Sequence, residues 1–179
     1  MMSRLTSVRI RAAQVADSEA IRDVERSAGQ RFREIGMEWV ASHEPMNAEK
    51  LGPYADHGRS WVAEDELLRP VGYVIAEIVD DCAHIEQLSV AFEHQGKGIG
   101  RALVEAVEAW AVASGLGGVT LTTFRDVGWN RPLYEHLGFS VLDQGELSEG
   151  LVEKREDEAL LGLERSPRVA MRKEFGPAP

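Results

Sequence analysis

The chain has 179 residues, of which 44% are hydrophobic and 28% charged, a composition typical of one folded domain rather than of a disordered protein. Its formal net charge of −10 argues against a nucleic-acid-binding protein, which normally carries a basic face. This charge is compatible with a cationic substrate, but a need for solubility explains it equally well.

Cysteine usage and hydropathy exclude further classes. Cys82 is the only cysteine, so no intrachain disulfide and no thiolate metal site can form. His43, His57, His94 and His136 have no partner spacing that suggests a metal. No apolar run approaches the roughly 18 residues that span a membrane. The segment Met1–Thr6 lacks the apolar core of a signal peptide. We therefore expect a cytoplasmic protein without a metal, a membrane partner or a nucleic-acid partner.

The first half of the chain alternates strand and helix signals. Residues 8–12 predict a strand, and Asp17 is placed to cap a helix that ends near Gly29. Residues 30–60 are irregular, with short helical pieces interrupted by proline and glycine. Hydrophobic runs then predict strands at residues 61–64, 71–78 and 84–90.

The second half begins with a strongly amphipathic helix from Ile99 to about Gly115. A β-branched strand at 119–124, a short helix after Asn130 and a strand at 139–142 follow. A charged insertion at residues 147–165 predicts another helix, before a last strand at 168–173. These elements predict one mixed α/β (α+β) domain over residues 1–179.

The run Gln95–Arg101 lies between a strand and a helix N-terminus, and holds three glycines within five residues. Without side chains, such a turn lets a phosphate approach several backbone N–H groups, with the positive end of the helix dipole behind them. Lys97 and Arg101 add positive charge. The run therefore predicts an anion site.

Two nucleotide signatures fail on this run. It has no G-x-x-x-x-G-K-[ST] sequence, and a G-x-G-x-x-G fingerprint starting at Gly96 meets Arg101 in its sixth position. A coenzyme A pyrophosphate loop is compatible with the spacing, and so is a purely structural glycine-rich turn.

The run Gln95–Gly100 resembles the Q/R-x-x-G-x-G/A signature of the GNAT superfamily of N-acetyltransferases. The resemblance extends to the preceding strand, to the following helix and to Asn130–Phe139, which is similar to the family's second conserved block. It implies a splayed mixed sheet of six to seven strands with helices on both faces. It also implies transfer of an acetyl group from acetyl-CoA to a primary amine.

The resemblance assigns cofactor contacts. It implies that the strand end pairs with the pantetheine arm, that the loop binds the pyrophosphate, and that a backbone N–H near Leu88 stabilises the oxyanion. Asn130 could contact the cofactor arm or merely cap its helix. The cofactor residues expected are Leu88, Ser89, Val90, Gln95, Gly96, Lys97, Gly98, Ile99, Gly100, Arg101, Asn130 and Tyr134.

The resemblance also assigns catalytic roles. Tyr134 is the expected general acid for the thiolate leaving group, with core packing as its alternative. Glu86 is the first candidate for the base that deprotonates the amine and His84 is the second, although either could simply bond a neighbouring strand.

The acceptor side is less defined. The resemblance implies that Phe32, Arg33, Met37 and Trp39 line the acceptor pocket, where helix packing explains them equally well. The insertion at 147–165 could cover the site or support a homodimer. Two other functions stay open: a non-catalytic acyl-CoA-binding or regulatory domain, and a transferase of another acyl group.

Overall fold

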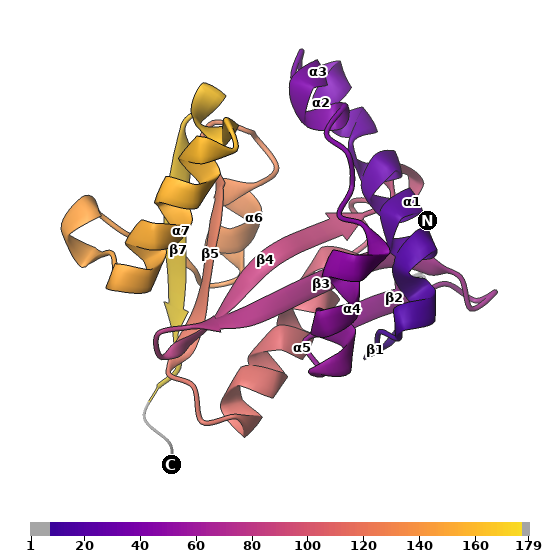
Figure 1. The fold of residues 1–179 in the computed structure, drawn as a ribbon, viewed down its shortest axis with the longest axis horizontal. Helices are drawn as coiled ribbons and strands as arrows, with labels where there is room; N and C mark the ends of the chain where they lie inside the picture. Colours follow the sequence, from indigo (N-terminus) through magenta and orange to yellow (C-terminus); the bar gives the residue numbers. More distant parts are fainter. Residues whose placement is uncertain (1–7, 177–179) are drawn as a thin grey trace, which may run out of the picture. The chain divides into compact units, whose positions relative to one another are not determined.

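The computed structural model describes residues 8–176 (Figure 1), so the segment Met1–Thr6 lies outside the described residues. The strands are β1 (Arg9–Ala12), β2 (Ser60–Glu64), β3 (Pro70–Val79), β4 (Cys82–Val90), β5 (Gly118–Phe124), β6 (Ser140–Val141) and β7 (Arg168–Glu174). The helices are α1 (Ser18–Ala28), α2 (Gln30–Glu34), α3 (Glu38–Ala41), α4 (Ala48–Asp56), α5 (Ile99–Ala113), α6 (Arg131–His136) and α7 (Glu149–Leu160). Every predicted strand and helix is present, within a few residues of its predicted bounds.

The strands form one seven-stranded mixed sheet in the order β1-β2-β3-β4-β5-β7-β6. The β4–β5 pair is parallel, and the β1–β2, β2–β3, β5–β7 and β6–β7 pairs are antiparallel. The β4–β5 ladder joins Cys82–Ile85 to Gly118–Leu121, whereas β4 itself continues to Val90. A shortened ladder of this kind is what a splayed sheet produces, and the predicted α/β class is confirmed.

The chain separates into two compact units, here called unit 1 and unit 2. Unit 1 holds residues up to 76 and residues 87–107, and unit 2 holds residues 77–86 and those from 108 onward. The elements β3, β4 and α5 each contribute residues to both units. The single-domain organisation stays a prediction, and the units are described one at a time.

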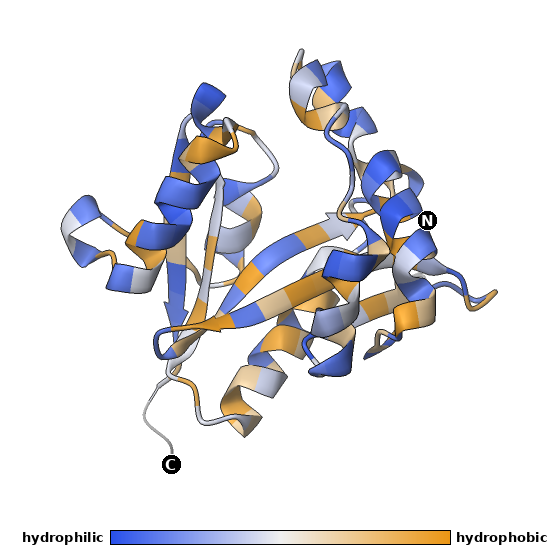
Figure 2. Ribbon diagram, in the orientation of Figure 1, coloured by the Kyte–Doolittle hydropathy of each residue, from blue (hydrophilic) through white to orange (hydrophobic). Residues whose placement is uncertain are grey.

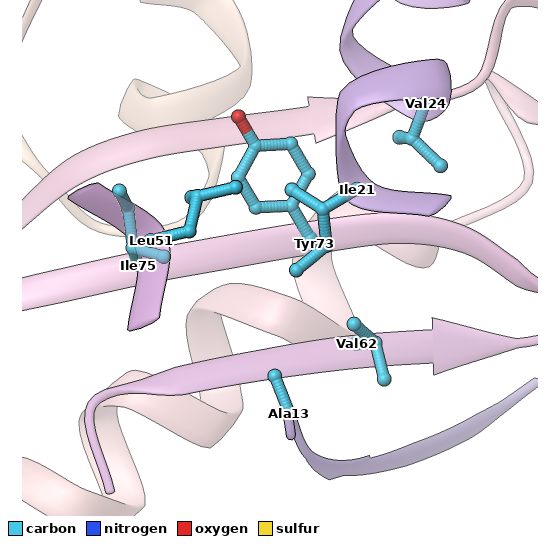
Figure 3. Packing of buried hydrophobic residues seen from close by; sticks show 7 residues of the cluster. All are labelled: Ala13, Ile21, Val24, Leu51, Val62, Tyr73 and Ile75. Carbon is cyan, nitrogen blue, oxygen red and sulfur yellow. The ribbon is translucent and has the colours of Figure 1, made fainter. Parts of the chain in front are cut away.

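In unit 1, helices pack on both faces of the sheet. Ile21 of α1 and Leu51 of α4 cluster with Val62, Tyr73 and other buried residues, and Figure 3 shows the Tyr73 ring within this cluster. The neighbouring Gly72 points to the opposite face, because a Cβ there would lie 3.0 Å from Ile99 and 3.2 Å from Leu103 of α5. A glycine in β3 thus lets α5, which carries the loop at its start, lie directly on the strand.

In unit 2, the insertion forms α7, which lies beside β5 and β7 (Figure 1). Hydrophilic residues dominate α7 (Figure 2), yet Leu151 is buried. A Cβ on Gly150 would lie 2.6 Å from Val79 and 2.8 Å from Asp80, so only glycine lets the helix approach this closely. The helix predicted for the insertion is confirmed, and it packs against residues of unit 2.

The predicted helix caps are partly wrong. Asp17 and Asn130 occupy the N-cap positions of α1 and α6, but neither side chain makes a capping hydrogen bond. The Asp17 carboxylate instead accepts the backbone N–H of Gln14 at 2.7 Å and binds the guanidinium of Arg11 at 2.8 Å. The Asp17 carboxylate is therefore engaged by Arg11 and by the preceding turn, and it does not cap α1.

Candidate functional site

The glycine run at the start of α5 has the backbone that its sequence predicts. Gly96 and Gly98 have φ angles of +74° and +82°, in the left-handed region. A Cβ at either position would meet no atom within 4 Å. Backbone conformation, rather than crowding, therefore requires glycine here, and the space where each side chain would begin is open.

The first turn of α5 presents N–H groups and positive charge. The N–H of Ala102 bonds the Gly98 carbonyl at 3.1 Å, so the N–H groups of the residues before it precede the hydrogen-bonded part of the helix. Buried Ile99 anchors the turn. Lys97 is exposed, and Arg101 pairs with Glu105 at 2.9 Å, both being more than half exposed. An exposed pair of this kind is weak, so the Arg101 guanidinium is free to turn to an anion.

Gln95 joins this loop to the end of β4. Its side-chain Nε2 donates to the Val90 carbonyl at 3.0 Å, and its Oε1 accepts from Arg31 at 3.3 Å. On β4, Ser89 is buried while Leu88 and Val90 are half-buried. Unit 1 thus brings together the loop and the strand end that were predicted to contact one cofactor.

His84 lies in the interior of unit 2. Its side chain is 2% exposed, and Nδ1 lies 2.9 Å from Oγ1 of Thr120 on β5. The pKa of His84 is lowered to about 4, first by burial and then by the nearby ammonium of Lys154, while the Glu77 carboxylate opposes this shift. The imidazole is therefore neutral at physiological pH.

Glu86 belongs to a charged cluster of unit 2. Lys154 Nζ from α7 lies 2.9 Å from Oε2 of Glu86 and 2.8 Å from Oε1 of Glu77, and His84 Nε2 lies 4.0 Å from Oε2 of Glu86. Burial raises the pKa of Glu86, the ammonium of Lys154 lowers it, and the Glu77 carboxylate raises it, so the net direction is upward. Both predicted base candidates thus share one cluster, whose cation comes from the insertion.

Tyr134 of α6 is buried, at 9% exposure. Its ring packs edge-on against Phe139, with centroids 5.8 Å apart and an interplanar angle of 70°. Burial raises the pKa of Tyr134 to about 12, although the Arg168 charge opposes this. The phenol therefore keeps its proton at physiological pH. Asn130 accepts the Tyr134 backbone N–H through its carbonyl, at 3.3 Å.

The four residues predicted to line the acceptor pocket lie in unit 1, on or next to α2 and α3. Phe32, Met37 and Trp39 are half-buried, and exposed Arg33 pairs with Glu38 at 3.0 Å. The nearby depression of about 310 Å³ is lined by residues that include Ser27, Gln30, Phe92 and His94, and by none of these four. Their role in acceptor binding stays a prediction.

Three residues of the unit 2 cluster were not singled out from the sequence: Glu77, Thr120 and Lys154. Glu77 had a weak signal, because it is a charged residue inside an otherwise apolar strand. Lys154 had none, since it is one of many charges in the insertion and lies 68 residues from Glu86. Contact over such a separation depends on the tertiary fold.

Over residues 8–176, no group of three or more histidine, cysteine, aspartate or glutamate side chains could hold a metal ion. Over the same range, no helix is both long and apolar enough to cross a membrane.

Comparisons with known proteins agree with this arrangement. Residues 20–139 match the model of the acetyltransferase (GNAT) family. The fold is similar to that of the PaiA N-acetyltransferase from Thermoplasma acidophilum in complex with coenzyme A (TM-score 0.70, 18% identity, 94% of this chain and 99% of that chain). It is also similar to the ribosomal-protein-S18-alanine N-acetyltransferase from Escherichia coli (TM-score 0.66, 18% identity, 97% of this chain and 97% of that chain). A third similar structure is N-acetylglutamate synthase from Neisseria gonorrhoeae in complex with coenzyme A and N-acetyl-glutamate (TM-score 0.69, 17% identity, 95% of this chain and 35% of that chain).

Proposed function

Because the chain belongs to the GNAT family of acetyltransferases, we propose that it transfers the acetyl group of acetyl-CoA to a primary amine by direct attack. The observation that carries the proposal is the pair of left-handed glycines, Gly96 and Gly98, at the start of α5. They expose backbone N–H groups at a helix N-terminus, where a pyrophosphate is stabilised by hydrogen bonds and by the helix dipole.

Cofactor binding uses the loop and the adjoining strand. The N–H groups of Gln95–Arg101 take the pyrophosphate, with Lys97 and Arg101 supplying charge. The backbone of Leu88–Val90 pairs with the pantetheine arm. The hydrogen bond from Gln95 to the Val90 carbonyl supports this assignment, because it holds loop and strand end together in one compact unit. Two of the structural neighbours are complexes with coenzyme A.

The transfer itself needs a base, an oxyanion donor and a proton for sulfur. An acceptor ammonium first loses a proton, and Glu86 is the first candidate to take it, with His84 second. The free amine attacks the thioester carbonyl, and a backbone N–H near Leu88 stabilises the oxyanion. The C–S bond then breaks as Tyr134 donates a proton to the departing sulfur. The attacking nitrogen loses its extra proton to solvent, which leaves the neutral amide, and Tyr134 regains a proton from solvent. The phenol of Tyr134 carries its proton at physiological pH, as a proton donor must, although burial makes it a weaker acid by raising its pKa to about 12.

The acceptor is proposed only as a primary amine, bound beside Phe32, Arg33, Met37 and Trp39. Two similar structures point to acetylated amines: one is named a ribosomal-protein-S18-alanine N-acetyltransferase, and the other is a complex with coenzyme A and N-acetyl-glutamate. The net charge of −10 is compatible with a cationic acceptor, and solubility accounts for it as well. A cytoplasmic location and a homodimer stay predictions.

The test is an acceptor panel in which thiol release from acetyl-CoA is followed by a thiol reagent. Polyamines, amino acids, aminoglycosides and peptides with free N-termini or lysines make up the panel. Thiol release that depends on both amine and enzyme supports the proposal. Coenzyme A binding by calorimetry without acetylation of any amine would contradict it and favour an acyl-CoA-binding domain. Transfer from succinyl-CoA alone would assign a different acyl group.

A further inference from the structure

The insertion contributes one side chain to the cluster around the proposed base. Lys154 lies in the middle of α7, and its Nζ is within 2.9 Å of carboxylates on two strands, Glu77 on β3 and Glu86 on β4. Its side chain is only 21% exposed, so this is not a surface pair that solvent screens. All three residues belong to unit 2.

The cluster holds two carboxylates, one ammonium and one neutral imidazole. The charged and titratable groups that face Glu86 are Glu77 from β3, His84 from its own strand and Lys154 from α7. His84 stays neutral because it is buried. The pKa of Lys154 is raised above its usual value by hydrogen bonds to the two carboxylates, against the effect of burial. Lys154 therefore remains an ammonium while Glu86 gains or loses a proton.

Two further attachments hold α7 in place independently of Lys154. At its start, Gly150 donates its N–H to Asp80 at 3.1 Å, and Leu151 is buried. Near its end, Glu158 accepts a hydrogen bond from Thr122 of β5 and pairs with Arg168 of β7 at 3.1 Å. Because the helix is fixed on both sides of Lys154, the ammonium is held in position rather than tethered loosely.

We propose that Lys154 is a positioning residue for acetyl transfer: its ammonium orients the Glu86 carboxylate and keeps it ionised, ready to accept the proton that the acceptor ammonium releases. The inference rests on the proposed function, and on Glu86 as its base. In this step the N–H bond of the acceptor breaks, an O–H bond forms on Glu86, and the amine keeps the electron pair with which it attacks. Glu86 later returns the proton to solvent.

Without Lys154, two carboxylates would face each other with no cation between them. Two neighbouring like charges favour protonation of one of the carboxylates, so the pKa of Glu86 would rise further. A smaller fraction of Glu86 would then be ionised at neutral pH and able to act as a base.

The test compares Lys154→Met, which keeps the length of the side chain but removes its charge, with Lys154→Arg, which keeps the charge. The matched control is Glu158→Gln, which weakens the attachment of α7 and leaves Lys154 untouched. Two readouts are used: the pH dependence of kcat/KM, and a ¹³C NMR titration of the Glu86 carboxyl, assigned with Glu86→Gln. Circular dichroism checks folding, and Lys154→Gln serves as a second neutral variant if Lys154→Met is unfolded.

The neutral variant should move the acid limb of the pH–rate profile to higher pH. It should also lower kcat/KM at pH 7 by tenfold or more, since general-base catalysis contributes roughly 10²–10⁴-fold. Lys154→Arg should restore most of this loss, and Glu158→Gln should leave the profile in place. An unchanged Glu86 titration in the neutral variant overturns the inference, as does an equal effect in Glu158→Gln. The NMR readout needs no acceptor, so it decides on Lys154 even if no amine is acetylated and the proposed function fails.

Discussion

The phenol hydroxyl of Tyr73 on β3 donates a 2.7 Å hydrogen bond to Oε2 of Glu25 on α1. Tyr73 is fully buried, and burial raises its pKa well above the usual value. Burial also raises the pKa of Glu25, while the hydrogen bond from Tyr73 lowers it. The Tyr73 hydroxyl therefore gives the Glu25 carboxylate a hydrogen-bond donor at the edge of the unit 1 core, and this bond links α1 to β3.

Replacing Tyr73 with phenylalanine should lower the free energy of unfolding by roughly 1–3 kcal/mol, because a partly buried carboxylate would lose its donor. Glu25 binds its proton more tightly in the folded than in the unfolded state, so the penalty should shrink as the pH falls through its raised pKa and the carboxyl becomes neutral. Urea denaturation of both proteins at pH 7 and pH 4.5 measures this. An equal penalty at both pH values would contradict the role of the Glu25 charge.

His84 should make the protein lose stability in mild acid. Its pKa is about 4 in the folded state against 6.5 for the free side chain, so the unfolded chain binds the proton first. Its contribution is therefore present above pH 6.5 and is lost as the pH falls towards 4, by on the order of 3 kcal/mol. His84→Asn, which can still bond Thr120, should flatten this part of the curve. Urea denaturation between pH 4 and 7 checks it, and parallel curves for both proteins would contradict it.

Tyr134→Phe should lower kcat by roughly 10²-fold or more, as expected when a general acid is lost. The affinity for acetyl-CoA should change little, because the ring and its packing against Phe139 remain. Steady-state kinetics with the best amine of the panel and calorimetry with coenzyme A separate the two effects. Unchanged turnover would remove Tyr134 from the mechanism.

Arg101→Glu should weaken coenzyme A binding, because a negative charge would replace a positive one beside the pyrophosphate. The loss should be largest at low ionic strength, since salt screens exposed charges. The matched control is Arg125→Glu, because Arg125 is also an exposed arginine with an acidic neighbour, Asp126 at 2.9 Å. Calorimetry at two salt concentrations measures both variants. Equal affinity in Arg101→Glu and the wild type would refute the assignment of the loop.

Much of the fold was predicted from the local spacing of hydrophobic residues along the chain. The seven strands, the long amphipathic α5 and the helix of the insertion depend on neighbours a few residues apart, and all were predicted from periodicity. The irregular stretch at residues 30–60 was predicted only as helical pieces. Its boundaries depend on packing against α1 and on a cap that was not foreseen, Asn47, whose side chain accepts the Lys50 N–H at 3.0 Å.

The loop that opens α5 was determined by the sequence itself. Gly96 and Gly98 adopt left-handed backbone conformations that only glycine adopts readily. The glycines in the sequence are therefore enough to predict this turn. The surroundings of Glu86 were decided by the tertiary structure. Lys154 lies 68 residues away in the chain, and no local rule selects it among the charges of the insertion. Only the docking of α7, which needs Gly150 against Val79 and Asp80, brings its ammonium to that carboxylate.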